Sequence, residues 1–365
     1  FVLTFPPPLR FMLAYDQALL TKAIACFVRA VSHWQRHEAK KRYGFESVSC
    51  AVTAAVTCVQ RFGSALNLNV HLHSLFPDGV WEKRGEDLVF RKLGRPTTDE
   101  LYDIGWRTCR RLIDHLRREG RWADDGDPDE PILTDEDFIA REPLLAEVYG
   151  ASIRGRLALG PGRGHRVMVL RSNPDLSAPK DLVTGRGHVF DVHAAVSVAQ
   201  GDRKGLERLC RYLCRPAVGN ERFERREDGR VMVRLKTPWS DGTTHVVLTS
   251  LQLVEKLVAL IPPPRAHMLR YHGALAPHAA RRASIVPAPG APSALGGDGP
   301  RCTHSGRQAY AMLMKRVFAI DVEQCSQCGE RDTRIRFVTA KDEIDRVLRS
   351  IGYANAPGPE HATSA

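Results

Sequence analysis

Two histidines separated by one residue, His71 and His73, lie in a short apolar run over residues 66–76. Residues i and i+2 of a β-strand project from the same face, so both imidazoles would reach a single metal ion, while Val70 and Leu72 would turn to the other face. Imidazole is a good ligand for divalent transition metals. The alternative is an ordinary strand whose histidines are solvated or hydrogen-bonded, and the spacing alone favours neither interpretation.

A helix is predicted over residues 203–214, because Asp202 is a suitable N-cap and Pro216 ends the helical pattern. Apolar residues recur along it at helical spacing and form one stripe, which consists of Leu206, Leu209, Cys210, Leu213 and Cys214. Such a stripe is typical of a helix that packs against the rest of a fold. Tyr212 lies away from the centre of this stripe, so its phenol is predicted to point elsewhere.

Tyr212 instead neighbours three arginines on the same helix. Arg208 lies one turn before it, and Arg211 and Arg215 are close to it on the helix surface. Guanidinium groups favour phenolate, the nucleophilic form of tyrosine, and they also attract a phosphate. A phenol presented in this way is suited to attack a phosphodiester. The alternative is a structural tyrosine that leans over the edge of the stripe with its hydroxyl in water.

Four segments, in order along the chain, resemble the bacterial rolling-circle insertion-sequence transposases of the HUH (His-hydrophobic-His) superfamily: residues 59–73, 206–216, 265–273 and 325–328. The resemblance implies an enzyme that nicks and rejoins single-stranded DNA at element ends and target. It implies that His71 and His73 bind Mg²⁺ or Mn²⁺, which polarises the scissile phosphate. Tyr212 would attack that phosphate and form a 5′-phosphotyrosine link, leaving a free 3′-hydroxyl.

The third metal ligand is left open between two residues. Gln60 lies on the strand expected beside the histidines, and His193 lies on the strand just before the tyrosine helix. His193 is slightly preferred, because imidazole is the better ligand for softer ions. DNA phosphates are expected to meet side chains around these residues, namely Asn69, Arg208, Arg211 and Arg215.

Two features depart from the family pattern. Relatives often carry two tyrosines four residues apart, whereas Arg208 occupies the upstream position here, so we expect one tyrosine to act alone, or with Tyr271 or a second protomer of a homo-oligomer. The N-terminal zinc-binding region of relatives is expected to be absent, and Cys325 with Cys328 would supply only half of a Zn²⁺ site. These departures keep open an alternative, a catalytically inactive DNA-binding remnant.

Composition agrees with a nucleic-acid partner. The 365 residues carry a formal charge of +11, which favours a polyanion because neutralising phosphates releases counterions. Nine cysteines without regular spacing indicate a reducing cytoplasm rather than a disulfide framework. No apolar run is long enough to span a bilayer, which argues against a membrane protein. The chain begins at Phe1 inside an expected strand, and we therefore expect a fragment of a longer protein.

The order of predicted elements favours an α/β fold of the HUH endonuclease type, with a central antiparallel sheet and flanking helices. A helix over residues 15–43 precedes a strand over 47–62 and the strand of the histidines. We expect the nuclease domain to cover residues 1–260.

A helical insertion is expected within this domain over about 97–182, with a basic helix at 97–122 and an irregular remainder from residue 138 on. A Pro/Gly/Ala-rich linker would follow at 261–300, and a small C-terminal segment at 301–365.

Overall fold

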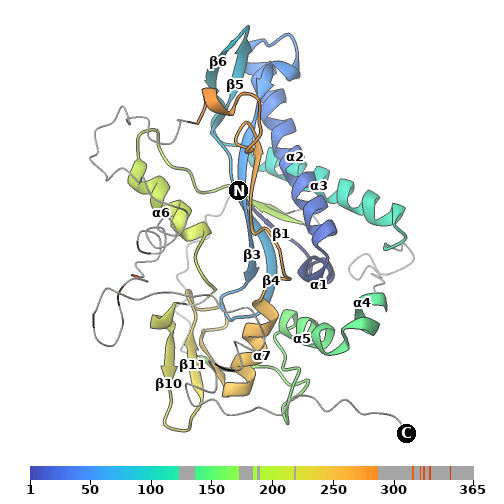
Figure 1. The fold of residues 1–365 in the computed structure, drawn as a ribbon, viewed down its shortest axis with the longest axis vertical. Coiled ribbons are helices and arrows are strands. Elements are labelled where there is room, and N and C mark those ends of the chain that lie inside the picture. The colour runs from blue at the N-terminus through green and yellow to red at the C-terminus, as the bar shows by residue number, and fades with distance from the viewer. Residues whose placement is uncertain are drawn as a thin grey trace. The chain divides into compact units, whose positions relative to one another are not determined.

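The computed structural model describes residues 1–122, 136–171, 184–186, 190–217 and 219–286, and a few single residues beyond, namely Lys315, Asp321, Gln324, Gly329 and Arg346. The chain divides into two compact units, Phe1–Pro292 and Ser293–Ala365. Helices and antiparallel strands make up the first unit and form a mixed α/β fold (Figure 1). The predicted α/β class, with antiparallel strands and flanking helices, is therefore confirmed.

The first unit is built around a six-stranded antiparallel sheet with the order β13-β3-β4-β1-β9-β8. Its strands are β1 (Val2–Thr4), β3 (Ala54–Phe62), β4 (Leu68–Leu75), β8 (Thr184–Arg186), β9 (Asp191–His193) and β13 (Leu269–Gly273). The strand of the histidines, β4, lies in the interior of this sheet between β3 and β1. Strands on both sides therefore fix its register.

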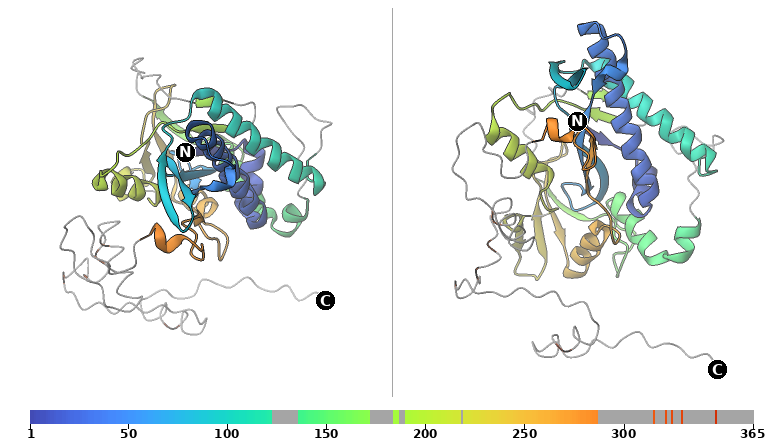
Figure 2. Two further views of the ribbon diagram at one scale, coloured as in Figure 1. Left: turned by 90° about the horizontal axis from the view of Figure 1, so that it is seen from above. Right: turned by 45° about the horizontal axis from the view of Figure 1, so that its top comes forward.

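Three helices cover one face of this sheet: α1 (Pro7–Tyr15), α2 (Gln17–Tyr43) and α3 (Thr98–Arg118) (Figures 1 and 2). Their apolar side chains pack in one core with Leu3, Leu72 and Val192 from the sheet. Gly105 allows α3 to approach closely, because a Cβ at this position would lie 3.3 Å from Val192 Cγ2. The sequence predicted α2 but not α1, which begins at Pro7 because proline is compatible with a first helical turn.

A second sheet contains four antiparallel strands in the order β10-β11-β12-β7. They are β10 (Phe223–Arg225), β11 (Val231–Arg234), β12 (Thr243–Leu248) and β7 (Met168–Arg171). The helix α7 (Ser250–Leu260) follows β12 directly and begins with a capping box between Thr249 and Gln252. Apolar residues of β11, β12 and α7 share a second core with Leu66.

The remaining elements are short. A three-stranded sheet contains β2 (Ala51–Val52), β5 (Gly79–Arg84) and β6 (Asp87–Lys92), and single 3₁₀ turns occur at Val48–Cys50, Asn220–Arg222 and Arg282–Ser284. Two helices lie inside the expected insertion, α4 (Glu136–Arg141) and α5 (Pro143–Ile153). The expectation of an irregular segment from residue 138 to about 182 is therefore wrong for the residues in α4 and α5, and its last part, from residue 172 on, lies outside the described residues. Apolar residues of α4 and α5 (Phe138, Ala146, Val148, Tyr149 and Ala151) join the main core.

Part of the expected linker also belongs to the fold. Residues Leu269–Gly273 form β13 and pair with β3, from Leu269 opposite Cys58 to Gly273 opposite Ala54. The sequence analysis missed this edge strand, because it is only five residues long and closely follows three consecutive prolines. None of the described helices is both long and apolar enough to cross a membrane.

Candidate active site

The two histidines project from the sheet face that α1, α2 and α3 leave uncovered. His71 lies opposite Gln60 of β3, and His73 lies opposite Cys58. Their rings meet edge-on with centroids 4.9 Å apart. The intervening Leu72 is fully buried in the core on the other face. Strand alternation therefore separates the histidines from the apolar side chains, as the sequence predicts.

Asn69 orients the imidazole of His71 through its backbone. The distance from His71 Nδ1 to the Asn69 carbonyl oxygen is 2.7 Å. A carbonyl only accepts, so Nδ1 carries the proton, and Nε2 of His71 keeps a free lone pair. Burial lowers the pKa of His71, which keeps the ring neutral at neutral pH. These are the tautomer and charge that a metal ligand needs.

His73 and Gln60 each have a buried polar atom without a partner. His73 Nε2 and Gln60 Oε1 make no hydrogen bond with any of the described residues. Burial, assisted by nearby positive charges including His71 and Arg215, lowers the pKa of His73 to about 3. The ring of His73 is therefore neutral, and in the tautomer protonated at Nδ1 its Nε2 can accept. Buried acceptors of this kind are rare in folded proteins and need an explanation, for which an ion is one candidate.

The side chains that could bind a metal here differ from those of a conventional metal site. The described residues contain no group of three or more His, Cys, Asp or Glu side chains that could hold an ion. The candidate ligands are instead two imidazoles and the carboxamide oxygen of Gln60. This mixture of nitrogen and oxygen donors suits Mn²⁺, and Mg²⁺ less well.

The two candidates for a third ligand lie at different distances from the histidines. Gln60 is on the strand next to His71 and directly opposite it. His193 pairs with Val2, which in turn pairs with His73, so two strand spacings of about 5 Å each separate the two histidine backbones. Gln60 is therefore the nearer candidate, although the sequence slightly favoured His193.

Tyr212 is brought to this face by α6 (Arg203–Leu213), which lies on the opposite side of the sheet from α2 and α3 (Figures 1 and 2). The Asp202 side chain caps the helix by accepting from the Gly205 amide, as predicted. The ring of Tyr212 stands edge-on against His73, with centroids 5.8 Å apart and an interplanar angle of 78°. The predicted nucleophile and a predicted metal ligand are thus in contact.

The C-terminal end of α6 is fixed to the sheet by two hydrogen bonds. The carbonyl oxygen of Leu213 accepts from Gln60 Nε2 at 3.0 Å and from Cys58 Sγ at 3.2 Å. Carbonyls in the last turn of a helix have no partner within the helix, so these side chains of β3 satisfy one of them. Cys58 was not singled out in the sequence, although it lies on the same face of its strand as Gln60.

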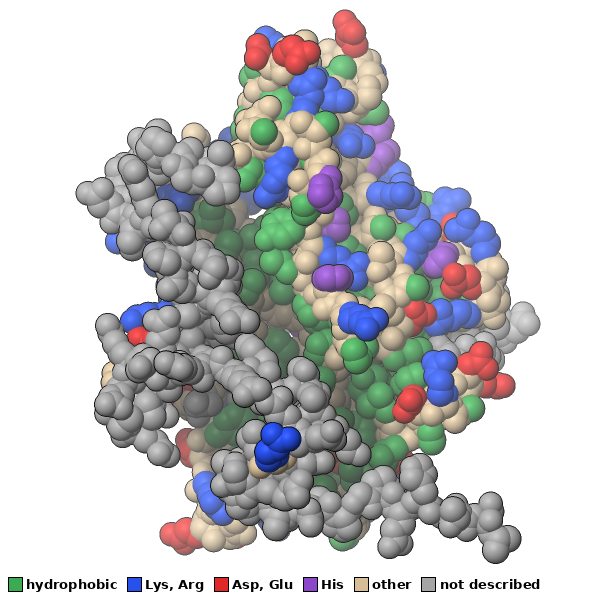
Figure 3. Space-filling view, in the orientation of Figure 1, with side chains coloured by type: hydrophobic (Ala, Val, Ile, Leu, Met, Phe, Trp, Pro, Cys, Tyr) green, Lys and Arg blue, Asp and Glu red, His purple; other side chains and the backbone are tan. Residues whose placement is uncertain are grey.

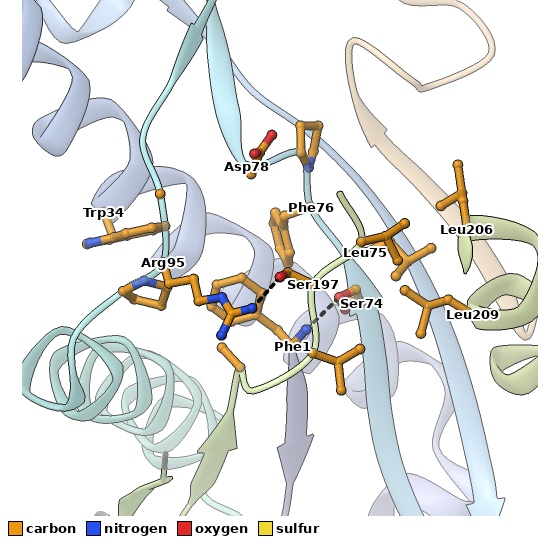
Figure 4. Close-up of a pocket in the computed structure, with 16 residues that line it drawn as sticks. Phe1, Trp34, Ser74, Leu75, Phe76, Asp78, Arg95, Ser197, Leu206 and Leu209 are labelled. Atoms are coloured by element: carbon orange, nitrogen blue, oxygen red, sulfur yellow. Dashed lines mark hydrogen bonds between the residues drawn. The ribbon is translucent and has the colours of Figure 1, made fainter. Parts of the chain in front are cut away.

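Most of the expected apolar stripe of α6 is not packed. Leu213 is buried, whereas Cys210 and Cys214 are exposed and Leu206 keeps 44% of its surface accessible. Leu206 and Leu209 line a hollow of about 240 Å³ that also borders Leu75, the last residue of the histidine strand (Figure 4). The fully buried part of the stripe is therefore confined to the last turn of the helix, and the rest packs less closely than an apolar stripe typically does.

Two cations lie against the Tyr212 ring. Arg215 Cζ and Lys236 Nζ are each 4.4 Å from its centroid. Lys236 comes from the loop between β11 and β12. No motif or spacing in the sequence links that loop to Tyr212, so Lys236 could not be predicted as a neighbour. Two other arginines were expected to bind phosphate. Of these, Arg211 forms an ion pair with Glu207 at 3.0 Å, and Arg208 is exposed.

The remaining expected site residues lie elsewhere. Tyr271 of β13 is opposite Val56, which alternation puts on the same face of β3 as Gln60, and it is 45% exposed. Cys325 and Cys328 lie outside the described residues. Basic side chains, with acidic ones among them, gather over α3 (Figure 3). This helix covers the opposite face, where Arg107 pairs with Asp103.

A comparison with models of known protein families gives a match over much of the chain. Residues 54–283, more than half of the chain, match the family model described as “Putative transposase”. The matched region includes the histidine strand, α6, the loop of Lys236 and β13. No curated protein and no solved structure gives a significant match.

Proposed function

The chain belongs to the “Putative transposase” family, and within it we propose an HUH-type enzyme that nicks and rejoins single-stranded DNA through Tyr212. The observation that carries this proposal is the contact between Tyr212 and His73, whose ring centroids are 5.8 Å apart. A nucleophile and a candidate metal ligand this close together would act on the same phosphate group. The biological process that fits is rolling-circle-like transposition of an insertion sequence.

The proposed first step exchanges one phosphate ester for another. Tyr212 Oη attacks the scissile phosphorus and loses its proton to solvent, the bond from phosphorus to the 3′-oxygen breaks, and the 3′-oxygen takes up a proton. Arg215 and Lys236 stabilise the negative charge on the phenolate and on the phosphate that it meets. In the second step, a 3′-hydroxyl of another strand attacks the phosphotyrosine and releases Tyr212. The number of phosphodiester bonds is unchanged, so no external energy source is needed.

His71, His73 and Gln60 would hold a divalent ion, Mg²⁺ or Mn²⁺. When bound, such an ion polarises the scissile phosphate. The buried His73 Nε2 and Gln60 Oε1 atoms, which lack hydrogen-bond partners, support this assignment. The Asn69 carbonyl would keep the His71 lone pair directed outward by holding the Nδ1 proton.

The test uses single-stranded oligonucleotides that tile the DNA flanking the gene of this chain. In the presence of Mn²⁺ we expect one of them to form a protein–DNA adduct that survives denaturing electrophoresis. Tyr212→Phe should abolish the adduct, because phenylalanine lacks the attacking oxygen. Tyr271→Phe is the matched control, and it should still form the adduct because Tyr212 is intact.

The possible results separate the proposal from its alternative. Equal adduct yields from the wild-type chain and Tyr212→Phe would show that the nucleophile is another residue. Single-stranded DNA binding without an adduct under any metal condition would identify a catalytically inactive DNA-binding remnant. Normal cleavage by a His71→Ala/His73→Ala variant in chelator would remove the metal from the mechanism.

A further inference from the structure

A cavity of about 340 Å³ opens beside the four-stranded sheet, away from the hollow under α6. One wall comes from the turn between β3 and β4, and the opposite walls come from the end of α5 and from β7 and β12. Its volume is at the lower end of the range for small-molecule sites. A single nucleotide is therefore a suitable size of occupant.

The lining of the cavity combines an aromatic ring with polar and apolar groups. Trp239 is 42% exposed, and its Nε1 points to Ser64 Oγ at 3.5 Å. Asn67 offers a carboxamide, for which Gly63 leaves room, because a Cβ at Gly63 would lie only 2.2 Å from Asn67 Oδ1. An indole on which a base can stack and an amide that can read its edge are typical of sites for nucleobases.

Positive charge dominates the rim of this cavity. Arg154 and Arg166 are exposed, and neither forms an ion pair in the described part of the chain. The carboxylate at the cavity, Asp241, accepts from the Thr243 amide at 3.0 Å and so holds the turn of Trp239. Free guanidinium groups beside an aromatic ring favour a phosphate-bearing ligand.

Two connections link the cavity to the tyrosine. The loop between β11 and β12 carries Lys236, which touches the Tyr212 ring, and three residues later Trp239, which lines the cavity. The β3–β4 turn supplies Asn67, four residues before His71 on one chain, a separation of about 13 Å when extended. A DNA strand that passes Tyr212 would therefore meet the cavity within a few nucleotides.

We propose that this cavity binds one unpaired base of the DNA strand, a few nucleotides from the scissile phosphate. Trp239 stacks on the base, Asn67 hydrogen-bonds its edge, and Arg154 and Arg166 bind an adjacent phosphate. The inference rests on the proposed function for the identity of the ligand as single-stranded DNA. It adds a site that fixes which phosphate reaches Tyr212.

The test measures DNA binding by fluorescence anisotropy in the Tyr212→Phe background, so that no covalent capture contributes. One abasic nucleotide is moved along the labelled single-stranded oligonucleotide that forms the adduct, or along each flanking oligonucleotide if none does. We expect one position to lose affinity by about 5- to 100-fold, the range for stacking on one aromatic side chain. When Trp239→Ala is added, removal of the base at that position should no longer lower the affinity, because base and ring act as a pair. Removal of the base at other positions should have the same effect as before.

Matched variants separate this site from general binding. Trp106→Ala removes a similarly exposed tryptophan from α3, on the other face of the sheet, and should leave the abasic profile unchanged. Trp239→Phe keeps a ring and should restore most of the affinity, which excludes misfolding as the cause. Arg154→Gln and Arg166→Gln should each make the slope of log K against log salt shallower by about 0.7.

A flat abasic profile, or a Trp239→Ala loss that is the same at every position, would overturn the proposal. Its failure is distinct from failure of the proposed function. An adduct through Tyr212 together with a flat abasic profile would support the proposed enzyme and exclude the proposed base site. If affinity depends on the base at one position and on Trp239, but no adduct forms, the base site is supported and the proposed enzyme activity is excluded.

Discussion

At the residue scale, two cations from different parts of the fold lie against the ring of Tyr212. Arg215 follows it by one turn, and Lys236 reaches it from a different sheet, each at 4.4 Å from the ring centroid. In the proposed reaction, these charges would stabilise the negative charge on the phosphate that Tyr212 attacks. Lys236 is not part of the tyrosine helix. A substitution at Lys236 therefore tests the effect of its charge on Tyr212 without changing the helix.

We expect Lys236→Gln to lower the rate of adduct formation at saturating DNA by about 10- to 100-fold, with a smaller loss of binding, because a lost charge at the reacting group acts mainly on the transition state. Single-turnover rates with labelled oligonucleotide measure this. Lys204→Gln is the control, since it removes the same charge from α6 at about 12 Å from Tyr212 along the helix. Equal losses in both variants would attribute the effect to net charge.

A second prediction at this scale concerns the third metal ligand. If Gln60 binds the ion, Gln60→Ala should weaken Mn²⁺ binding at least about 10-fold, as losses at metal sites commonly do. His193→Ala should leave it within about twofold, because its strand is two positions from that of His73. Titration calorimetry with Mn²⁺ and the Tyr212→Phe protein gives both values without turnover. If His193→Ala weakens Mn²⁺ binding more than Gln60→Ala does, His193 rather than Gln60 is the third ligand.

The placement of the histidines on one strand face and of Tyr212 away from its apolar neighbours could be predicted because these signals are local. Alternation puts His71 and His73 on one strand face, and helical periodicity sets Tyr212 apart from its apolar neighbours. The choice between Gln60 and His193 required strand order, which no local pattern contains. Lys236 required the arrangement of two sheets, and its sequence surroundings are those of an ordinary hairpin.

At the element scale, α6 is held in an unusual way for a helix with an apolar stripe. Only Leu213 of the stripe is buried, and the side chains of Cys58 and Gln60 bind its carbonyl. Periodicity predicted the helix and its cap correctly but not its exposure, because burial depends on the distance to the sheet. A helix fixed at one end positions Tyr212 firmly and leaves its N-terminal turns to open locally.

We expect Leu213→Ala to speed amide hydrogen exchange in α6 by about 10-fold or more, because a buried leucine contributes about 2 to 5 kcal/mol. Exchange in β3 and β4 should change little, since their own core lies on the other face. Leu206→Ala is the control in the same helix, and its exposed side chain should leave exchange nearly unchanged. Equal acceleration in both variants would mean that α6 is held along its whole length.

At the scale of the whole molecule, one buried arginine joins the parts that carry the site. Arg61 of β3 is 3% exposed, and its guanidinium donates to three backbone carbonyls, those of Ala14, Ala259 and Leu260. It also donates to the Tyr149 hydroxyl at 3.3 Å. The sheet of the histidines is thereby tied to α1, α5 and α7. From sequence, Arg61 counts as one more basic residue for DNA, and only burial reveals its structural role.

We expect Arg61→Lys to lower the free energy of unfolding by about 2 to 4 kcal/mol. An ammonium group cannot reproduce the planar fork that serves carbonyls from two helices, so buried acceptors lose their donors. Urea unfolding measures the loss, and Arg110→Lys is the control, because the same change at a side chain that is 65% exposed should cost less than about 0.5 kcal/mol. Unchanged stability in Arg61→Lys would mean that apolar packing alone holds α1, α5 and α7 against the sheet. The expected loss would show that the hydrogen bonds of Arg61, which is next to Gln60 in the chain, hold α1, α5 and α7 against the sheet. Both proposed sites depend on this arrangement.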